Sequence, residues 1–238
     1  MNKNICRLAV IPARGGSKRL PNKNTLDFHG KPMIAWTIEA ALNSLKFDKV
    51  LVSTDSIEIA EISKFYGAEV PFLRQSAADD FSTVSDATLL ALEQGESYWK
   101  QRFDSIALLM ANCPLRDVSD VVKHVEIFDS SETNFQISAF EYGFSNPWWA
   151  CRLDEQMIPS PLFPEALKAR SQDLDRLYCP TGAIWIANRD SFKKAGTFYG
   201  PRHTYCPISW QSGTDIDEYH DLELAKALMA QKLMETFR

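Results

Sequence analysis

Short apolar runs alternate with helical periodicities along the first half of the chain. The continuous apolar runs, typical of strands buried on both faces of a parallel sheet, cover residues 8–11, 50–52 and 106–110. Apolar residues spaced three and four apart, typical of helices, cover residues 32–45, 57–66, 85–98 and 120–128. Because strands alternate with helices, we predict an α/β fold built on an open, mostly parallel sheet.

This alternation breaks after a further strand predicted at residues 136–140. Between about 142 and 178, prolines and aromatic residues follow one another with neither period, which indicates an excursion from the sheet, either a hairpin arm or a lid. A buried strand at 182–187 and a long helix at 218–237 then resume the pattern. We therefore expect a single domain over residues 1–238 with one inserted arm.

The composition excludes several classes of protein. With 238 residues, 45% of them hydrophobic and 24% charged, the chain can bury a substantial core, so it is neither disordered nor fibrous. Its apolar stretches fall far short of the roughly 20 residues that a membrane-spanning helix needs, and we expect no membrane partner. The formal net charge of −5 argues against a nucleic-acid partner, because phosphate binding requires a basic face.

The cysteines and the N-terminal segment indicate the compartment. The first apolar run, residues 8–11, is too short for a secretory signal. The five cysteines include no CxxC pair, so they predict neither a disulfide framework nor a zinc site. We expect a cytoplasmic protein.

Two short segments have strongly unequal charge. Residues 7–31 carry six Lys or Arg against the single acid Asp27, whereas residues 215–221 carry four acids and no Lys or Arg. Such asymmetry indicates a small anionic ligand rather than a long polyanion.

The basic segment contains a glycine loop, residues 13–24, directly after the first strand. Open parallel sheets bind ligands at this end of a strand. Adjacent glycines can direct successive backbone N–H groups at an anion, and Arg and Lys side chains add charge for phosphate oxygens. The loop matches neither the dinucleotide fingerprint nor the Walker motif, and a solvated basic turn is the alternative.

Several motifs together carry a family resemblance. Residues 8–24 read LAVIPARGGSKRLPNKN, followed by GKPMI at 30–34, VSTD at 52–55 and GAEVPFLR at 67–74. Later motifs are PLR at 114–116, RSQDL at 170–174, GAI at 182–184, GP at 200–201 and TDID at 214–217. The chain resembles the acylneuraminate cytidylyltransferases, which are the CMP-sialic acid synthetases and their relatives acting on legionaminic and pseudaminic acids. The resemblance spans almost the whole chain.

The resemblance implies a fold and a reaction. The fold is a Rossmann-like nucleotidyltransferase fold with an inserted dimerisation arm, and the partner is a second copy in a homodimer. In the reaction, CMP passes from CTP to the anomeric hydroxyl of a nine-carbon 3-deoxy-2-ulosonic acid, either sialic acid or a legionaminic or pseudaminic relative, and pyrophosphate leaves. The alternatives are a CMP-Kdo-type or other sugar nucleotidyltransferase and a CTP-binding regulator without catalysis.

The resemblance also assigns roles to residues. The residues that match the family's nucleotide site are Ala13, Arg14, Gly15, Gly16, Ser17, Lys18, Lys23 and Thr83. Of the matched residues, Arg14, Lys23 and Asp217 take catalytic roles. For Thr83, expected near the cytosine, the open alternative is a helix cap.

Asp215 and Asp217 are the candidate metal ligands. Their spacing of two places both carboxylates on one face of an extended segment. Mg²⁺ suits such a pair, since it is held by one or two carboxylates together with phosphate oxygens and water. The alternative is an acidic N-cap in which Asp217 or Glu218 begins the last helix. The resemblance favours Mg²⁺ as cofactor with CTP as co-substrate.

The segments that match the family's sugar site depart from its pattern. Many sialic acid synthetases read LQPTSPLR where this chain reads LMANCPLR at 109–116, so Met110 replaces a glutamine. A thioether cannot donate or accept hydrogen bonds as an amide does, which predicts a more apolar pocket for a deoxygenated or further acylated acid. Arg170 is the expected partner of the sugar carboxylate, and its alternative is a surface arginine of the arm. The predicted sugar-binding residues are Met110, Asn112, Arg170, Gln172 and Thr181.

Overall fold

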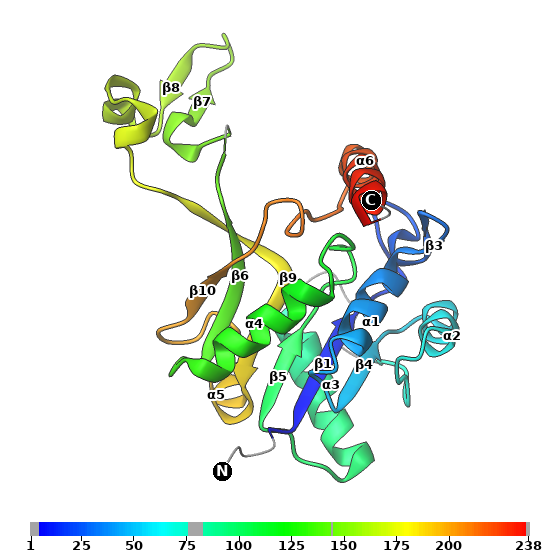
Figure 1. Cartoon of the computed structure of the whole chain (residues 1–238). Coiled ribbons are helices and arrows are strands. Elements are labelled where there is room, and N and C mark those ends of the chain that lie inside the picture. Colours follow the sequence, from blue (N-terminus) through cyan, green and yellow to red (C-terminus); the bar gives the residue numbers. More distant parts are fainter. Residues whose placement is uncertain (1–4, 76–82, 144, 237–238) are drawn as a thin grey trace.

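The computed structural model describes residues 5–75, 83–143 and 145–236. A six-stranded sheet lies at the centre of the fold (Figure 1). Its strand order is β10–β6–β9–β5–β1–β4. The bounds are Arg7–Pro12 for β1, Lys49–Ser53 for β4, Ser105–Leu108 for β5, Phe135–Glu141 for β6, Tyr178–Asn188 for β9 and Thr204–Pro207 for β10. β9 pairs antiparallel with β5 and β6, and the other pairs are parallel. The predicted mostly parallel α/β sheet is confirmed.

The helices follow the predicted periodicities closely. Their bounds are Met33–Asn43 for α1, Ile57–Phe65 for α2, Val84–Trp99 for α3, Val118–Ser130 for α4, Arg189–Ala195 for α5 and Tyr219–Thr236 for α6. The last residue of the predicted terminal helix, Phe237, lies outside the described residues. α5 and β10 were not predicted. β10 is an edge strand in which only Cys206 is buried, so it lacks the apolar run of a central strand.

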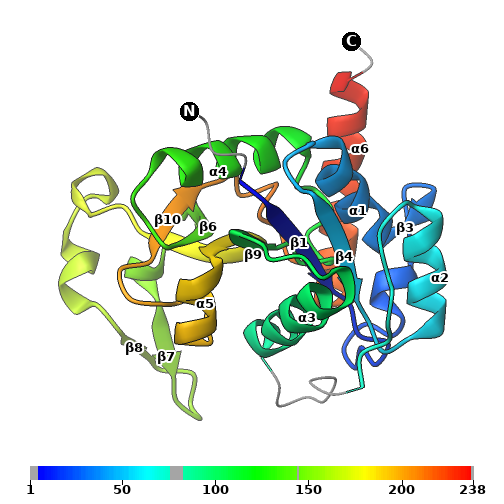
Figure 2. The same ribbon diagram turned by 90° about the horizontal axis from the view of Figure 1, so that it is seen from below.

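Alternating side chains of β1 supply the cores on both faces of the sheet. Ala9 and Ile11 are fully buried in the cluster that contains residues of α1, α2 and α4. Leu8 and Val10 are fully buried in the cluster that contains residues of α3 and α5. Figure 2 shows α1 and α4 on one side of the sheet and α3 and α5 on the other. The apolar run at 8–11 therefore reflects burial on both faces, as predicted.

A third, smaller cluster joins α6 to the segment that follows β1. It contains Phe28 of the short hairpin formed by β2 (Asp27–Phe28) and β3 (Lys31–Pro32), together with Leu20 and Ile216. Ala225 of α6 packs in the same cluster. Because Ile216 lies between Asp215 and Asp217, this cluster holds the acidic segment beside the basic loop.

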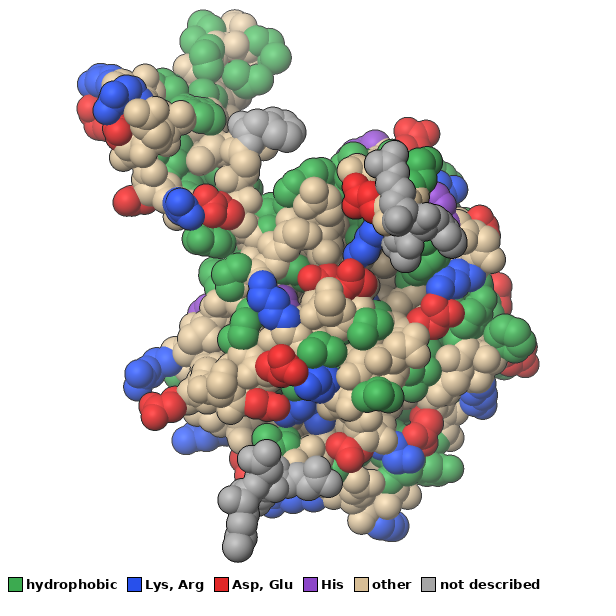
Figure 3. Space-filling view, in the orientation of Figure 1, with side chains coloured by type: hydrophobic (Ala, Val, Ile, Leu, Met, Phe, Trp, Pro, Cys, Tyr) green, Lys and Arg blue, Asp and Glu red, His purple; other side chains and the backbone are tan. Residues whose placement is uncertain are grey.

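The segment between β6 and β9 projects away from the sheet (Figure 1). It consists of a hairpin of β7 (Cys151–Leu153) and β8 (Pro159–Pro161) and the 3₁₀ turns η2 (Pro147–Trp149), η3 (Pro164–Lys168) and η4 (Ser171–Asp173). The rings of Trp148 and Phe163 contact each other edge to face, with their centroids 5.0 Å apart. Apolar side chains gather on this arm in Figure 3, and the large exposed ones are Trp149, Leu153, Met157, Ile158, Leu162, Phe163 and Leu167.

None of the helices in the described part of the chain combines the length and the apolar character needed to cross a membrane.

Candidate functional site

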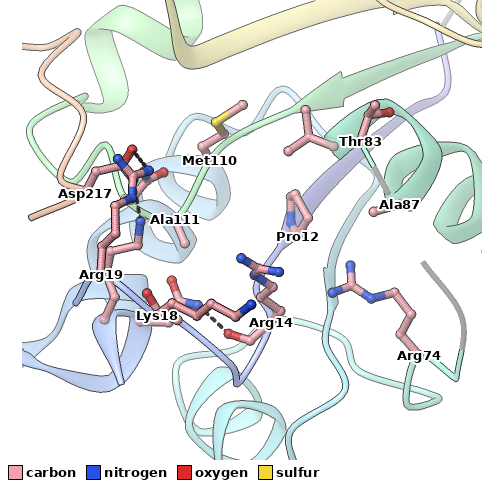
Figure 4. A pocket seen from close by; sticks show the side chains of 15 residues that line it. Pro12, Arg14, Lys18, Arg19, Arg74, Thr83, Ala87, Met110, Ala111 and Asp217 are labelled. Carbon is pink, nitrogen blue, oxygen red and sulfur yellow. Dashed lines mark hydrogen bonds and ion pairs between the residues drawn. The ribbon is translucent and has the colours of Figure 1, made fainter. Parts of the chain in front are cut away.

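A cavity of about 450 Å³ opens at the carboxyl ends of β1 and β5 (Figure 4). Its lining includes Pro12 at the end of β1 and, from the loop that follows, Arg14, Ser17, Lys18, Arg19, Lys23 and Asn24. The remaining lining residues are Arg74, Thr83, Val84, Ala87, Met110, Ala111, Asn112 and Asp217. The cavity thus lies where ligands bind in open parallel sheets, and all of its charged lining side chains except Asp217 are basic.

The backbone of the glycine loop is anchored to neighbouring segments. Ala13 donates its N–H to the carbonyl of Ser53 at 3.0 Å, and Gly15 donates its N–H to Oδ1 of Asp55 at 2.9 Å. Asn24 donates from Nδ2 to the carbonyl of Arg14 at 3.1 Å. A Cβ on Gly15 would lie 3.2 Å from the Cβ of Ser56, so this glycine permits a close approach to the start of α2.

The predicted nucleotide residues divide into two groups. Arg14, Ser17, Lys18, Lys23 and Thr83 line the cavity. The others, Ala13, Gly15 and Gly16, belong to the same loop but are not among the lining residues. The backbone N–H that was expected to contact phosphate at Gly15 is bonded to Asp55 in this structure.

The two candidate metal ligands converge on one side chain. Nδ2 of Asn112 donates to Oδ1 of Asp215 and lies 3.4 Å from Oδ1 of Asp217. Residues 214–217 lie outside the strands, so the two carboxylates converge from an irregular connection and not from a β-strand. Because both carboxylates lie close to the same amide nitrogen, they are close enough together for their oxygens to bind one cation.

The capping alternative for Asp217 is resolved by Asp221. Oδ2 of Asp221 accepts the backbone N–H groups of Asp217 at 3.0 Å and of Glu218 at 2.8 Å, just before α6. The carboxylate of Asp217 instead accepts from Nζ of Lys23 at 2.8 Å and from Nη2 of Arg19. Asp217 therefore directs its charge into the cavity.

The two carboxyl groups have opposite pKa shifts. Burial and the nearby negative charge of Asp217 raise the pKa of Asp215 to about 6. Burial also acts to raise the pKa of Asp217, but the hydrogen bond and charge of Lys23, with the charge of Arg19, outweigh it and hold that pKa below its ordinary value. Asp217 is therefore the strongly ionised member of the pair.

This donor set fits Mg²⁺. The candidate ligands are the carboxylate oxygens of two residues, and within residues 5–75, 83–143 and 145–236 no group of three or more His, Cys, Asp or Glu side chains is placed to hold a metal. Two protein carboxylates leave the remaining positions to phosphate oxygens and water, which is the coordination that Mg²⁺ commonly keeps at nucleotide sites.

Arg74 is a cavity residue to which the sequence assigned no role. Its side chain is 5% exposed, and its Nε has no hydrogen-bond partner among the described residues. Burial lowers its pKa, the charge of Asp55 acts in the opposite direction, and Arg14 adds to the lowering. Figure 4 shows the guanidinium groups of Arg74 and Arg14 directed into the same cavity. A buried arginine donor without a partner at a cavity wall is suited to an anionic or hydrogen-bond-accepting ligand.

Thr83 caps α3, as the alternative reading of this residue proposed. Its Oγ1 accepts the backbone N–H of Asp86 at 3.1 Å, and the carboxylate of Asp86 accepts the backbone N–H of Thr83 at 2.9 Å. This is a capping box. Thr83 also lines the cavity, where the cap holds it in place. Its contact to cytosine stays a prediction.

The predicted sugar residues are not brought together in the single chain. Met110 and Asn112 line the cavity. Thr181 is buried and donates its hydroxyl to the carbonyl of Gly213 at 2.7 Å, so that hydroxyl is already bonded within the protein. Arg170 and Gln172 lie exposed on the arm, where Arg170 pairs with Asp173 at 2.7 Å. The arm projects from the sheet, which separates these two side chains from the cavity.

Comparison with known proteins identifies the family. The model of the cytidylyltransferase family matches residues 8–135. The pseudaminic acid cytidylyltransferase of Campylobacter jejuni is 35% identical, and the match covers 95% of this chain and 96% of that protein. The chain belongs to the cytidylyltransferase family. It is therefore a nucleotidyltransferase.

Other relatives of this cytidylyltransferase agree with that assignment. The CMP-N,N'-diacetyllegionaminic acid synthase of Legionella pneumophila is 35% identical, with 93% of this chain and 95% of that protein covered. Among solved structures, a CMP-2-keto-3-deoxy-manno-octonic acid synthetase complexed with CTP has a TM-score of 0.69 and 20% identity. That match covers 95% of this chain and 99% of the solved one, and it supports the fold.

Proposed function

We propose that this cytidylyltransferase transfers CMP from CTP to the anomeric hydroxyl of a nine-carbon 3-deoxy-2-ulosonic acid of the sialic, legionaminic or pseudaminic type. The main support for the proposal is a single cavity lined both by basic side chains of the loop after β1 and by the carboxylate of Asp217. The relatives that are named for pseudaminic and legionaminic acid support this substrate class, because this chain matches them over nearly their full lengths.

The basic side chains neutralise and position the triphosphate. Arg14, Lys18 and Lys23 face the cavity from one loop, and their charges would stabilise the negative charge on the phosphate oxygens as the bond to pyrophosphate breaks. Arg74 would bind the nucleotide through its guanidinium group, which Figure 4 shows directed into the cavity. Because phosphoryl transfer depends mostly on positioning and charge neutralisation, these residues supply much of what the reaction requires.

Asp215 and Asp217 would hold Mg²⁺ beside the phosphates. When bound, the ion would supply further charge neutralisation at the reacting phosphoryl group. Asn112 keeps the two carboxylates close together through its amide nitrogen.

Met110 would form the apolar part of the acceptor site. Its side chain lines the cavity, and its backbone N–H donates to the carbonyl of Gly182 at 3.2 Å. A thioether makes apolar contact in place of the hydrogen bonds that an amide offers, so it favours a sugar with fewer hydroxyl groups at that position.

Gly182→Ala is expected to raise the KM for the acid about tenfold and to leave the KM for CTP unchanged. A Cβ at this position would lie 2.1 Å from Sδ of Met110, so the flexible Met110 side chain would have to move, and the cavity is the open space beside it. Steady-state kinetics with each substrate varied in turn would measure the effect. The double variant with Met110→Ala should behave as Met110→Ala alone; an equal rise in the KM for CTP would contradict the assignment.

A homodimer would complete the acceptor site. The arm presents exposed apolar side chains, including Leu153, Ile158 and Phe163, that a second copy would cover. Arg170 and Gln172 lie on the same arm, so a partner's arm is the means by which these side chains would reach the acid. We retain the cytoplasm as the proposed compartment.

Pyrophosphate release tests the proposed function. Purified protein with Mg²⁺ would be offered CTP, UTP or ATP in combination with N-acetylneuraminic, legionaminic, pseudaminic or Kdo acid. We expect pyrophosphate release with CTP and a nine-carbon acid. Release with Kdo alone would favour the CMP-Kdo alternative, and CTP binding without release across the panel would favour the regulator. A single-chain mass in sedimentation of the same preparation would contradict the dimer.

A further inference from the structure

Both carboxylate oxygens of Asp217 are occupied by cationic side chains of the chain itself. Nζ of Lys23 donates to Oδ1 at 2.8 Å, and Nη2 of Arg19 donates to Oδ2. Nη1 of Arg19 lies 3.8 Å from Oε1 of Glu218. Figure 4 shows the Arg19 guanidinium against Asp217 at the edge of the cavity. Neither the sequence motifs nor the proposed mechanism gives Arg19 a role.

A divalent cation and these two side chains compete for the same oxygens. A metal that approaches Asp217 in the nucleotide-free chain meets two positive charges, which repel it and already satisfy the carboxylate. The metal therefore gains little there until the two side chains find other partners.

The triphosphate provides those partners. Arg19 and Lys23 belong to the loop after β1, where the triphosphate is proposed to bind, and both line the cavity. Phosphate oxygens accept from arginine in a bidentate arrangement and from lysine as a point charge. The Arg19 side chain is 61% exposed, and exposed ion pairs are weak, so its bond to Asp217 is easily exchanged.

We propose that Arg19, with Lys23, stands in for the metal on Asp217 and makes divalent-cation binding conditional on nucleoside triphosphate. This inference rests on the proposed function and on Asp217 as a metal ligand. Nucleotide binding draws the two side chains onto phosphate oxygens and frees the carboxylate. By linkage, the cation and the nucleotide then raise each other's affinity by the same factor, and Arg19 sets part of that factor.

The test is Mn²⁺ binding to the nucleotide-free full chain, measured by the electron paramagnetic resonance signal of the free ion. Arg19→Gln should raise the affinity for Mn²⁺ about tenfold over wild type, because one competing charge is gone. Adding Asp217→Asn to Arg19→Gln should abolish that gain. Arg102→Gln is the matched control: Arg102 is 65% exposed and pairs with Asp190 at 2.5 Å, away from the cavity lining, and its loss should leave the affinity unchanged.

A second measurement tests the coupling. Calorimetric titration with CTP, in the absence of acid, should show that Ca²⁺ raises CTP affinity less in Arg19→Gln than in wild type. Unchanged Mn²⁺ affinity in Arg19→Gln, or an equal gain in Arg102→Gln, overturns the inference. Pyrophosphate release by the wild-type chain tests the proposed function separately. If the wild-type chain releases pyrophosphate but Arg19→Gln does not change Mn²⁺ affinity, only the role of Arg19 is wrong.

Discussion

Asp217→Asn is expected to lower the rate of pyrophosphate release by about a thousandfold while the chain remains folded. Asparagine keeps the shape of the side chain but removes the charge that faces Lys23, Arg19 and the proposed cation. The backbone contact at this position is a bond from the Asp217 N–H to Asp221, which asparagine retains. The loss should therefore appear in turnover and in metal dependence rather than in folding.

Turnover, melting temperature and Mg²⁺ titration of the purified variant measure this effect. Glu126→Gln is a suitable control, because Glu126 is a 61% exposed carboxylate on α4 that pairs with Lys46 away from the cavity. The control should retain wild-type turnover. If Asp217→Asn kept even a tenth of the wild-type rate at saturating Mg²⁺, Asp217 would not be the metal ligand that the mechanism requires.

Arg74→Met should raise the KM for CTP about thirtyfold and leave the melting temperature unchanged or higher. A thirtyfold rise in KM corresponds to the loss of one hydrogen bond to a charged group, which is worth about 2 kcal/mol. Stability should not fall, because methionine removes a buried donor that has no partner among the described residues, while the backbone N–H of Arg74 still donates to Thr54 at 2.7 Å.

Arg74→Lys distinguishes charge from geometry at the same position. Lysine keeps the positive charge but lacks the planar fork of the guanidinium group, so we expect it to recover only part of the CTP affinity. Isothermal titration with CTP would measure both variants directly. A large loss of stability in Arg74→Met, with CTP affinity preserved, would show that Arg74 is a structural residue.

The parts of the fold that local pattern determines were predictable. β1 and the loop after it follow from a buried apolar run and two adjacent glycines, both of which are visible in consecutive residues. The long helices follow from apolar spacing, and their cores are made by those same positions. β10 was missed because an edge strand with one buried face does not need an apolar run.

The parts that distant contacts determine were not predictable. Asp217 was equally compatible with a helix cap, because its true partner Lys23 lies 194 residues away in the sequence. The burial of Arg74 depends on how its segment packs beside the cavity, which no local pattern encodes. Arg170 and Gln172 were predicted with the sugar residues, but the direction in which the arm leaves the sheet separates them from the cavity of their own chain.

The central claim is that the anomeric oxygen of a nine-carbon acid attacks the α-phosphorus of CTP in this cavity. Mass spectrometry of the products formed from CTP and an acid labelled with ¹⁸O at its anomeric hydroxyl tests it most directly. We expect a CMP conjugate of the acid that retains the label, together with an equimolar amount of unlabelled pyrophosphate. Free CMP without a conjugate, or label in the pyrophosphate, would contradict it.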